Sequence, residues 1–206
     1  LAAQAELGYT PNLLARGLVK NRTATVGVVI PEFANPFFVA MVSGIESVAA
    51  ARRFLTIVGE SRRQEAEERL YVEQFRQFRI GGIIASPATI QLDHLAAARA
   101  AGIPVIVMAW PWPDGDYVAT DDVQGGTLAA QHLLTRAHRR IGIVRMADPG
   151  HAPVQARIQG FREVLAAAGA SVPDTWDVQV PGTQIEDGIV AADRVLALAT
   201  RPSALF

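Results

Sequence analysis

The chain has 206 residues, of which 50% are hydrophobic and 19% are charged, and its formal net charge is −1. This composition is typical of a globular protein, and the chain is long enough for one large domain or two smaller lobes. The charge excludes a globally basic nucleic-acid coat, and the absence of cysteine excludes disulfides and thiolate metal sites. No apolar run reaches the roughly 18 residues of a membrane helix, and the first residues lack a signal-peptide pattern. We therefore expect a cytoplasmic protein without a membrane segment.

Residues 1–22 carry a local basic excess, with Arg16, Lys20 and Arg22 against the acidic Glu6. A basic patch at one end of a chain suits contact with phosphates. On charge alone, an ordinary solvated tail is the simpler interpretation.

A short helix is predicted over 12–19, because Pro11 fixes a backbone angle that suits the first turn of a helix. Two turns are marginal in water, and Gly17 weakens the helix by roughly a further 1 kcal/mol relative to alanine. We expect this segment to become helical when something docks against it. Residues 1–7 have the pattern of the end of a preceding helix.

After residue 22, short apolar runs alternate with segments of helical periodicity. The runs are rich in β-branched residues and nearly continuous in apolar character, as expected of strands buried on both faces. The predicted strands are 26–31, 54–60, 80–87, 103–110, 140–146 and 176–180, and the predicted helices are 36–52, 63–78, 90–101, 124–137, 152–169 and 185–200. This alternation predicts an α/β fold with parallel sheets and right-handed crossovers.

The proline-rich and acidic segment 110–116 is the clearest break in this pattern, and we interpret it as a linker. The alternation restarts at residue 140, which indicates a second lobe. We predict a headpiece remnant and hinge over 1–22, a first Rossmann-like lobe over 23–118 and a second over 119–206. The chain starts within a predicted helix and stops as a strand begins, so we expect the second lobe to be incomplete.

Ligands of such folds bind beyond the carboxyl ends of the strands, and the first strand is followed by Asn35, Pro36, Phe37 and Phe38. Asn35 is a good helix cap, and Pro36 suits the first helical turn. Adjacent aromatic residues cannot share one face of a helix, so one is expected to pack inward and the other to face the ligand. An aromatic face suits the apolar side of a sugar ring, whose hydroxyls would need polar partners such as Asn35. Core packing is the alternative for both phenylalanines.

Further candidates follow later strands. Trp110 ends the fourth predicted strand and is either a pocket wall or a core residue. Asp121 precedes a helix, where an acidic side chain complements the helix dipole. Arg157, on the helix after the fifth predicted strand, offers a rigid five-donor fork suited to vicinal hydroxyls or a carboxylate, with a surface ion pair as its alternative. His132 and His138 lack a metal-ligand pattern, so we expect them to be structural.

Three motifs together resemble the LacI/GalR family of bacterial transcription regulators. They are the segment from Tyr9 to Leu18 directly before a strand, Asn-Pro-Phe-Phe at 35–38, and Arg-x-x-Gly-Phe at 157–161. The resemblance extends over essentially the whole chain. It implies a periplasmic-binding-protein-like type I fold, a homodimer, and a sugar or sugar derivative bound between two lobes as the effector. It also implies that operator DNA is read by an upstream helix-turn-helix headpiece, almost all of which we expect to be missing from this sequence.

The resemblance assigns roles to single residues. The hinge positions that match the family and would contact DNA are Tyr9, Pro11, Asn12, Ala15, Arg16 and Leu18. Leu18 would insert between base pairs in the minor groove and kink the DNA. The candidate effector-binding residues are Asn35, Phe37, Phe38, Trp110, Asp121, Gln124, His151, Arg157 and Thr183. Thr183 stands where the family often has an aromatic residue, which indicates a different or smaller ligand.

We therefore predict a ligand-responsive transcription repressor of the LacI type, with no enzymatic activity, no cofactor and no metal. No dinucleotide-binding, P-loop, nucleophile-elbow or metal-ligand motif is found in the sequence. The alternative is a periplasmic sugar-binding protein of a transport system, which shares the fold and the Asn-Pro-Phe-Phe group but has no need of the hinge-like segment. The sequence leaves open the effector, its sign as inducer or corepressor, and the operator.

Overall fold

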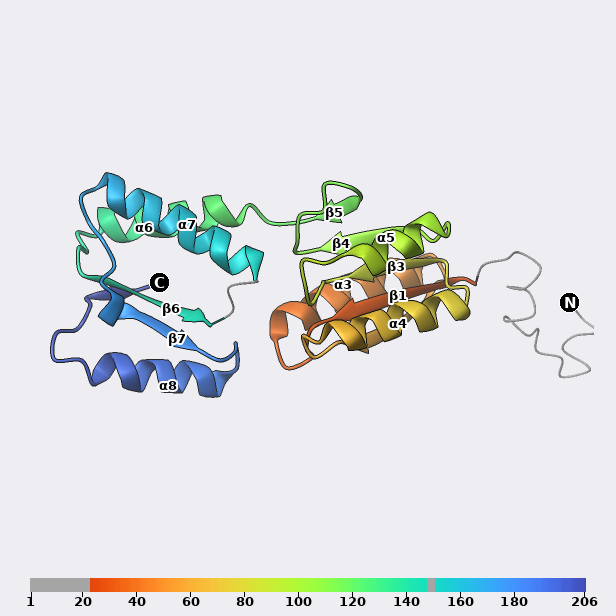
Figure 1. Cartoon of the computed structure of the whole chain (residues 1–206), viewed down its shortest axis with the longest axis horizontal. Helices are drawn as coiled ribbons and strands as arrows, with labels where there is room; N and C mark the ends of the chain where they lie inside the picture. The colour runs from red at the N-terminus through yellow and green to blue at the C-terminus, as the bar shows by residue number, and fades with distance from the viewer. Residues whose placement is uncertain (1–22, 148–150) are drawn as a thin grey trace, which may run out of the picture. The chain divides into compact units, whose positions relative to one another are not determined.

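The computed structural model of the chain describes residues 23–147 and 151–206 (Figure 1). The predicted headpiece remnant and hinge over 1–22, with all the DNA-binding candidates from Tyr9 to Leu18, lie outside these described residues. Strands and helices alternate along the described chain, and its paired strands are parallel. The predicted α/β fold with parallel sheets is therefore confirmed.

The chain divides into two compact units, with the boundary between Val118 and Ala119. The described elements of the first unit are β1 (Thr25–Ile30), α3 (Pro36–Ala51), β2 (Leu55–Glu60), α4 (Glu65–Gln77), β3 (Gly82–Ala85), α5 (Asp93–Ala100), β4 (Val105–Met108) and β5 (Asp116–Val118). Those of the second unit are α6 (Asp122–Thr135), β6 (Ile141–Met146), α7 (Ala152–Ala167), the 3-10 helix η1 (Asp174–Trp176), β7 (Asp177–Val180), α8 (Ile185–Leu196) and β8 (Ala204–Leu205).

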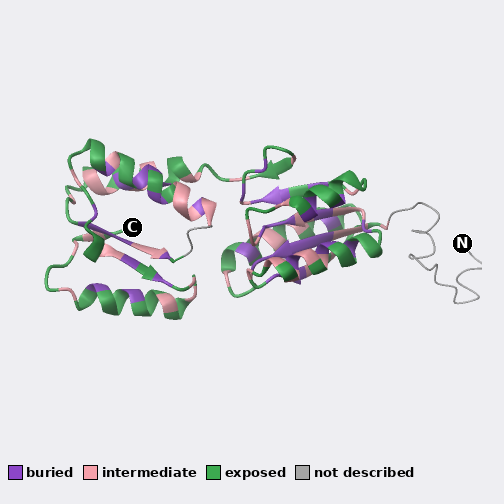
Figure 2. Cartoon of the chain, viewed as in Figure 1, coloured by how far each residue is buried: buried purple, intermediate pink, exposed green. Residues whose placement is uncertain are grey.

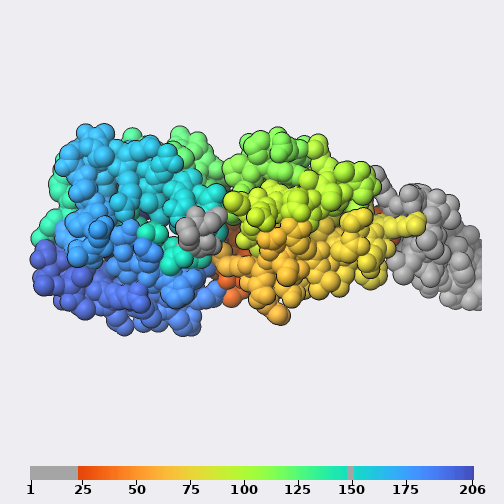
Figure 3. All heavy atoms as spheres, viewed as in Figure 1, coloured from red at the N-terminus to blue at the C-terminus, as the bar shows by residue number. Residues whose placement is uncertain are grey.

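The sheet of the first unit has the strand order β2-β1-β3-β4-β5. Alternate residues of β1 face opposite sides of it, as the pleat of a strand requires. Val28 and Ile30 pack with Phe38 of α3 on one face, and Gly27 lies against Phe75 of α4 on the other. α4 and α5 lie side by side over that second face (Figures 1 and 3). Buried residues follow the strands and the inward sides of the helices (Figure 2).

The second unit has the strand order β7-β6-β8. Ile141 and Ile143 of β6 are fully buried and form a core with residues of α6 and α7, including Phe161. The ring of Phe161 stacks on that of Phe206 with centroids 4.2 Å apart. α8 packs on β7 through a second cluster that contains Val178 and Val195.

α6 and α7 approach each other at two glycines. A Cβ atom at Gly126 would lie 1.8 Å from the carbonyl oxygen of Arg157, and one at Gly160 would lie 2.1 Å from that of Val123. Each distance is far below van der Waals contact, so neither position can hold a side chain at this helix separation. Gly126, and Gly160 of the Arg-x-x-Gly-Phe motif, therefore set the packing of these two helices.

The interpretation of 110–116 as a linker is wrong. Trp110 and Trp112 are buried, and Asp116 begins the strand β5, which pairs with β4 through Ile106 and Asp116. The ring of Trp112 occupies the space where a side chain at Gly115 would go. Proline and acidic residues suggested an exposed connection, but burying two indole rings stabilises the segment as part of the first unit.

Candidate functional site

Asn35, Phe37 and Phe38 follow the carboxyl end of β1, as predicted. The side chain of Asn35 caps α3, with its Oδ1 accepting the backbone N–H of Phe37 at 3.0 Å. Phe37 is 50% exposed, whereas Phe38 is 6% exposed and belongs to the core. The two rings meet edge to face with centroids 5.2 Å apart. One aromatic packs inward and the other faces out, so Phe37 is the one available to stack on a ligand.

The loop between β1 and α3 is fixed by acidic side chains that sequence reasoning missed. Glu60 Oε1, at the end of β2, accepts the backbone N–H of Phe33 at 2.8 Å. Glu32 Oε1 and Arg63 Nη2 lie 2.7 Å apart, with both side chains largely shielded from solvent. These contacts tie the ends of β1 and β2 together and hold the loop that presents Asn35 and Phe37.

A buried carboxylate holds the next loop at the same edge of the sheet. Glu68 of α4 is fully buried, and its Oε2 accepts the backbone N–H of Ala88, beyond the end of β3, at 2.5 Å. Its Oε1 lies 2.6 Å from Nε2 of His94 on α5. An ionised carboxylate only accepts, so with Glu68 ionised the imidazole is the donor. Sequence reasoning missed this brace, because a Glu within an amphipathic helix normally marks the solvated face.

A second ion pair joins the same two helices at the surface. Arg69 of α4 donates through Nη1 and Nη2 to both carboxylate oxygens of Asp93, at 2.9 and 2.6 Å, and through Nε to Glu65. These hydrogen bonds from Arg69 lower the pKa of the Asp93 carboxyl, and hydrogen bonds to Asp93 and Glu65 raise that of the guanidinium.

Trp110 follows β4 directly after Ala109, whose backbone has a positive φ of 59°. The Trp110 side chain is only 8% exposed. This burial supports the core-packing alternative for Trp110 and leaves little of the ring for contact with a ligand.

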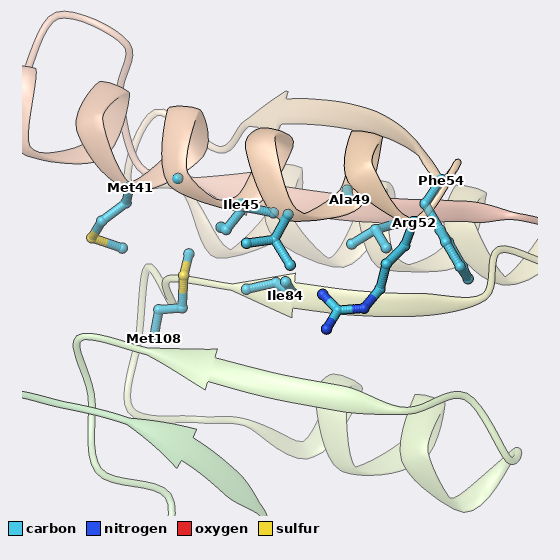
Figure 4. A pocket seen from close by; sticks show the side chains of 10 residues that line it. Met41, Ile45, Ala49, Arg52, Phe54, Ile84 and Met108 are labelled. Atoms are coloured by element: carbon cyan, nitrogen blue, oxygen red, sulfur yellow. The ribbon is translucent and has the colours of Figure 1, made fainter.

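An apolar pocket of about 600 Å³ lies between α3 and the sheet of the first unit. Met41, Ile45, Ile84 and Met108 point into it, and Arg52 reaches across one end (Figure 4). Arg52 is the single charged side chain among the lining residues. A sugar needs several fixed polar partners for its hydroxyls, so this pocket does not have the chemistry of a sugar site.

In the second unit, Asp121 caps α6 by accepting the backbone N–H of Gln124 at 2.9 Å through Oδ1. Asp121 therefore lies at the amino end of a helix, where its charge was expected, and also caps that helix. Asp121 and Gln124 are both exposed. Asp122, the next residue, is better shielded, and its side chain is 13% exposed.

Arg157 on α7 forms an ion pair with that neighbouring aspartate. Its Nε lies 2.9 Å from Oδ1 of Asp122 and also donates to the carbonyl oxygen of Pro153 at 3.3 Å. The Arg157 side chain is 46% exposed. The ion-pair alternative is thus observed, and both contacts, to Asp122 and to Pro153, are made by the same nitrogen, Nε.

His151 is the N-cap of α7, with Nδ1 accepting the backbone N–H of Val154 at 3.4 Å. Thr183 lies exposed in the turn between β7 and α8, directly before the cap residue Gln184. Three of the predicted effector residues, Asn35, Asp121 and His151, are therefore helix N-caps. Backbone N–H groups and polar caps gather at such helix ends, which suits them to hydroxyl or anionic ligands.

Two negative findings apply to residues 23–147 and 151–206. No group of three or more His, Asp or Glu side chains is placed to hold a metal ion. No helix in these ranges is both long enough and apolar enough to span a bilayer.

Known proteins resemble the chain over its length. It is 28% identical over 212 residues to the HTH-type transcriptional repressor PurR of Photobacterium profundum, and 29% identical over 208 residues to the ribose operon repressor of Escherichia coli K12. Each alignment covers 100% of this chain but 62% of the relative, so the chain spans less than two thirds of these repressors.

A solved LacI family transcriptional regulator from Enterococcus faecium, with bound ribose, is 29% identical and superposes with a TM-score of 0.71. The superposition covers 88% of this chain and 66% of the other. The family described as periplasmic binding proteins and sugar binding domain of LacI family matches residues 23–204. The chain therefore belongs to this family, and the resemblance to LacI-type regulators is confirmed.

Proposed function

We propose that the chain is the effector-binding part of a ligand-responsive transcription repressor. The observation that carries this proposal is the family match over residues 23–204. In addition, the alignments with two relatives that are named as repressors cover the whole chain. The protein acts in the cytoplasm as a homodimer, is not an enzyme, and controls the binding of operator DNA.

The effector is a sugar or a sugar derivative. The related regulator from Enterococcus faecium was solved with ribose, and the first unit here offers an exposed aromatic ring beside a polar cap. The candidate effector-binding residues of the first unit are Phe37, for stacking, and Asn35, for hydrogen bonding. Those of the second unit are Asp121, Gln124, His151, Arg157 and Thr183. Phe38 and Trp110 support this site from the core, in agreement with their burial.

Arg157 is the residue with the largest expected contribution to binding. A guanidinium that is oriented by an ion pair loses less conformational entropy when it binds a ligand. Asp122 supplies that orientation at 2.9 Å. Hydrogen bonds that involve a charged group contribute more than neutral ones, so Arg157 both fixes and strengthens effector binding.

Operator binding involves residues 1–22, through Tyr9, Pro11, Asn12, Ala15, Arg16 and Leu18. The effector acts by favouring one of two conformations of the repressor, and its influence on DNA binding equals its difference in affinity for the two.

A thermal-shift screen against sugars, sugar phosphates and nucleosides tests the effector proposal. A ligand at about 100 times its dissociation constant should stabilise the fold by roughly 2.7 kcal/mol. Arg157→Ala should weaken the affinity for the best ligand by about 10- to 100-fold. Arg162→Ala is the matched control, because Arg162 lies on the same helix, is similarly exposed and also pairs with an aspartate, Asp177, at 2.8 Å. Equal affinities in the Arg157→Ala variant and the wild type would remove Arg157 from the site.

The second candidate function is a periplasmic sugar-binding protein, because the matched family includes such proteins. It predicts sugar binding with no response to DNA. The repressor proposal instead predicts that a DNA duplex binds the chain and that binding changes when the sugar is added.

A further inference from the structure

Four arginines lie at one edge of the first unit, at the ends of two neighbouring helices. Arg52 and Arg53 directly follow α3. Arg76 lies in the last turn of α4, and Arg79 lies just after that helix. Helices α3 and α4 run back along parallel strands, so their carboxyl ends lie at the amino edge of the sheet. We call these four residues the arginine rim.

The arginine rim surrounds the point at which residues 1–22 join the sheet. Thr23 donates its backbone N–H and its hydroxyl to the carbonyl oxygen of Arg79, at 2.9 and 3.2 Å. On the other side, the backbone N–H of Leu55, two residues after Arg53, donates to the carbonyl oxygen of Ala24 at 2.9 Å. Arg53 and Arg79 thus flank the first residues of β1 from two directions.

The sequence at this edge is rich in positive charge. Segments 49–54 and 73–81 carry four arginines and one acidic residue, Glu73, which pairs with Arg76 at 2.7 Å. Arg99, at the end of α5, is not counted in the rim, because it donates to the carbonyl oxygen of Asp114 beside the acidic start of β5.

Two rim residues occupy positions that normally select glycine. Arg53 and Arg79 have positive φ angles of 59° and 51°, and each is the residue after a helix cap. Glycine is the usual choice there because a Cβ atom is strained in the left-handed region. Arginine side chains also complement the negative end of a helix, but that benefit does not require the strained position. Four other described non-glycine residues also have a positive φ, so the strain supports a role for Arg53 and Arg79 only together with their place beside the start of β1.

We infer that the arginine rim contacts the phosphate backbone of DNA, beside the DNA bound by residues 1–22. This inference rests on the proposed function and names a surface that lies outside the hinge. Arginine suits phosphate because its planar fork can donate two hydrogen bonds to one group. Phosphate contacts carry no sequence information, so the rim strengthens binding to all DNA sequences alike.

The salt dependence of DNA binding tests the inference. The probe is a fluorescent DNA duplex of random sequence and about 30 base pairs, bound by the 206-residue chain from about 50 to about 200 mM salt. The affinity for DNA falls as salt rises, so a plot of log affinity against log salt has a negative slope. Each phosphate contact that is lost should reduce the magnitude of that slope by about 0.9. Arg53→Gly and Arg79→Gly should each lower it by that amount, and the double variant by about twice as much.

Arg62→Gly is the matched control. Arg62 also has a positive φ, of 52°, and an exposed side chain, but it lies at the opposite edge of the sheet, beside Glu60. All three substitutions relieve the same backbone strain, so melting temperatures that stay equal or rise exclude unfolding as the cause of weaker binding. A slope that falls only for Arg53 and Arg79 supports the rim, and an equal fall for Arg62→Gly overturns it.

Arg16→Gln separates the rim from the proposed function. If Arg16→Gln lowers the slope and the rim variants do not, the rim is overturned while DNA binding by residues 1–22 stands. If the wild-type chain does not bind the duplex at about 50 mM salt, the rim and the DNA-binding part of the proposed function both fail. Sugar binding in the thermal-shift screen is independent of both outcomes.

Discussion

The two units of this protein follow the same strand–helix plan but hold neighbouring helices together in different ways. In the first unit, the buried carboxylate of Glu68 joins α4 to His94 of α5. In the second, α6 and α7 make close backbone contact at Gly126 and Gly160. The contact between α4 and α5 depends on a buried polar group that needs its partner. The contact between α6 and α7 depends on the absence of a side chain at the two glycines. Similar sequence patterns can therefore be sensitive to opposite kinds of substitution.

The difference also bears on the proposed site. Glu68 holds the loop after β3 through Ala88, so polar groups position the edge of the first unit. In the second unit, the carbonyl oxygen of Arg157 itself contacts Gly126. Helix packing therefore brings the backbone of Arg157 close to α6, where the side chain forms its ion pair with Asp122.

The largest effect is expected at the glycine contact. Gly126→Ala should destabilise the protein by about 3 kcal/mol or more, because the new methyl group would overlap the backbone of α7. Gly125→Ala is the control, since nothing lies within 4 Å of a Cβ atom there. It should stabilise the helix by up to about 1 kcal/mol. Urea denaturation of both variants measures the difference, and equal midpoints would contradict the packing argument.

The second prediction concerns the buried brace of the first unit. His94→Leu keeps the volume but leaves Glu68 Oε1 without its donor in a buried setting. We expect a loss of about 2–3 kcal/mol in the free energy of unfolding. Asp93→Asn, which weakens the exposed pair between the same two helices, should have little effect at neutral pH. If Asp93→Asn cost as much as His94→Leu, burial would not be what makes the brace important.

Helix ends in the second unit allow a smaller test. Ala137 follows α6 with a positive φ of 62°, whereas α7 has Gly169 in the equivalent place with a φ of 68°. Ala137→Gly should raise the free energy of unfolding by about 1 kcal/mol by removing left-handed strain. Ala168→Gly, one residue before Gly169 and at negative φ, should instead lower it by roughly 0.5–1 kcal/mol. A lower melting temperature in Ala137→Gly would contradict this explanation.

The smallest effect is the acid titration of the exposed pair in the first unit. Hydrogen bonds from Arg69 hold the pKa of Asp93 below the ordinary value of 3.8. The stabilisation is therefore complete above that value and is lost as the pH falls through the lower pKa of the folded state. Asp93→Asn should remove this part of the pH dependence, seen as a flatter curve of melting temperature below about pH 4. An unchanged curve would assign the acid sensitivity to other carboxyls.

Much of the fold could be predicted from local pattern. The apolar runs identified β1, β2, β6 and β7 to within one residue at each end, and β3 and β4 to within two, a normal error at element ends. Asn35 and Asp121 could be named as caps because capping depends on residues only a few positions apart. Helical geometry likewise predicted that one of Phe37 and Phe38 would pack inward and the other face outward, but not which one.

Contacts between distant segments could not be predicted. The brace joins Glu68 and His94 across 26 positions, and no local signal distinguishes the buried Glu68 from the partly exposed Glu65 and Glu67 beside it. The burial of Trp112, which reversed the linker interpretation of 110–116, depends on where the indole ring packs.

The sequence by itself determined the alternation of strands and helices, the family, and the set of polar and aromatic residues at the strand ends. Periodicity, capping and motifs are local properties, so they can be read along one chain. Only the tertiary structure decided that a side chain would clash at Gly126 but not at Gly125, that Phe38 and Trp110 are buried, and that Arg157 pairs with Asp122. Those outcomes depend on which surfaces meet in three dimensions, where a shift of one methyl group decides whether two helices can touch.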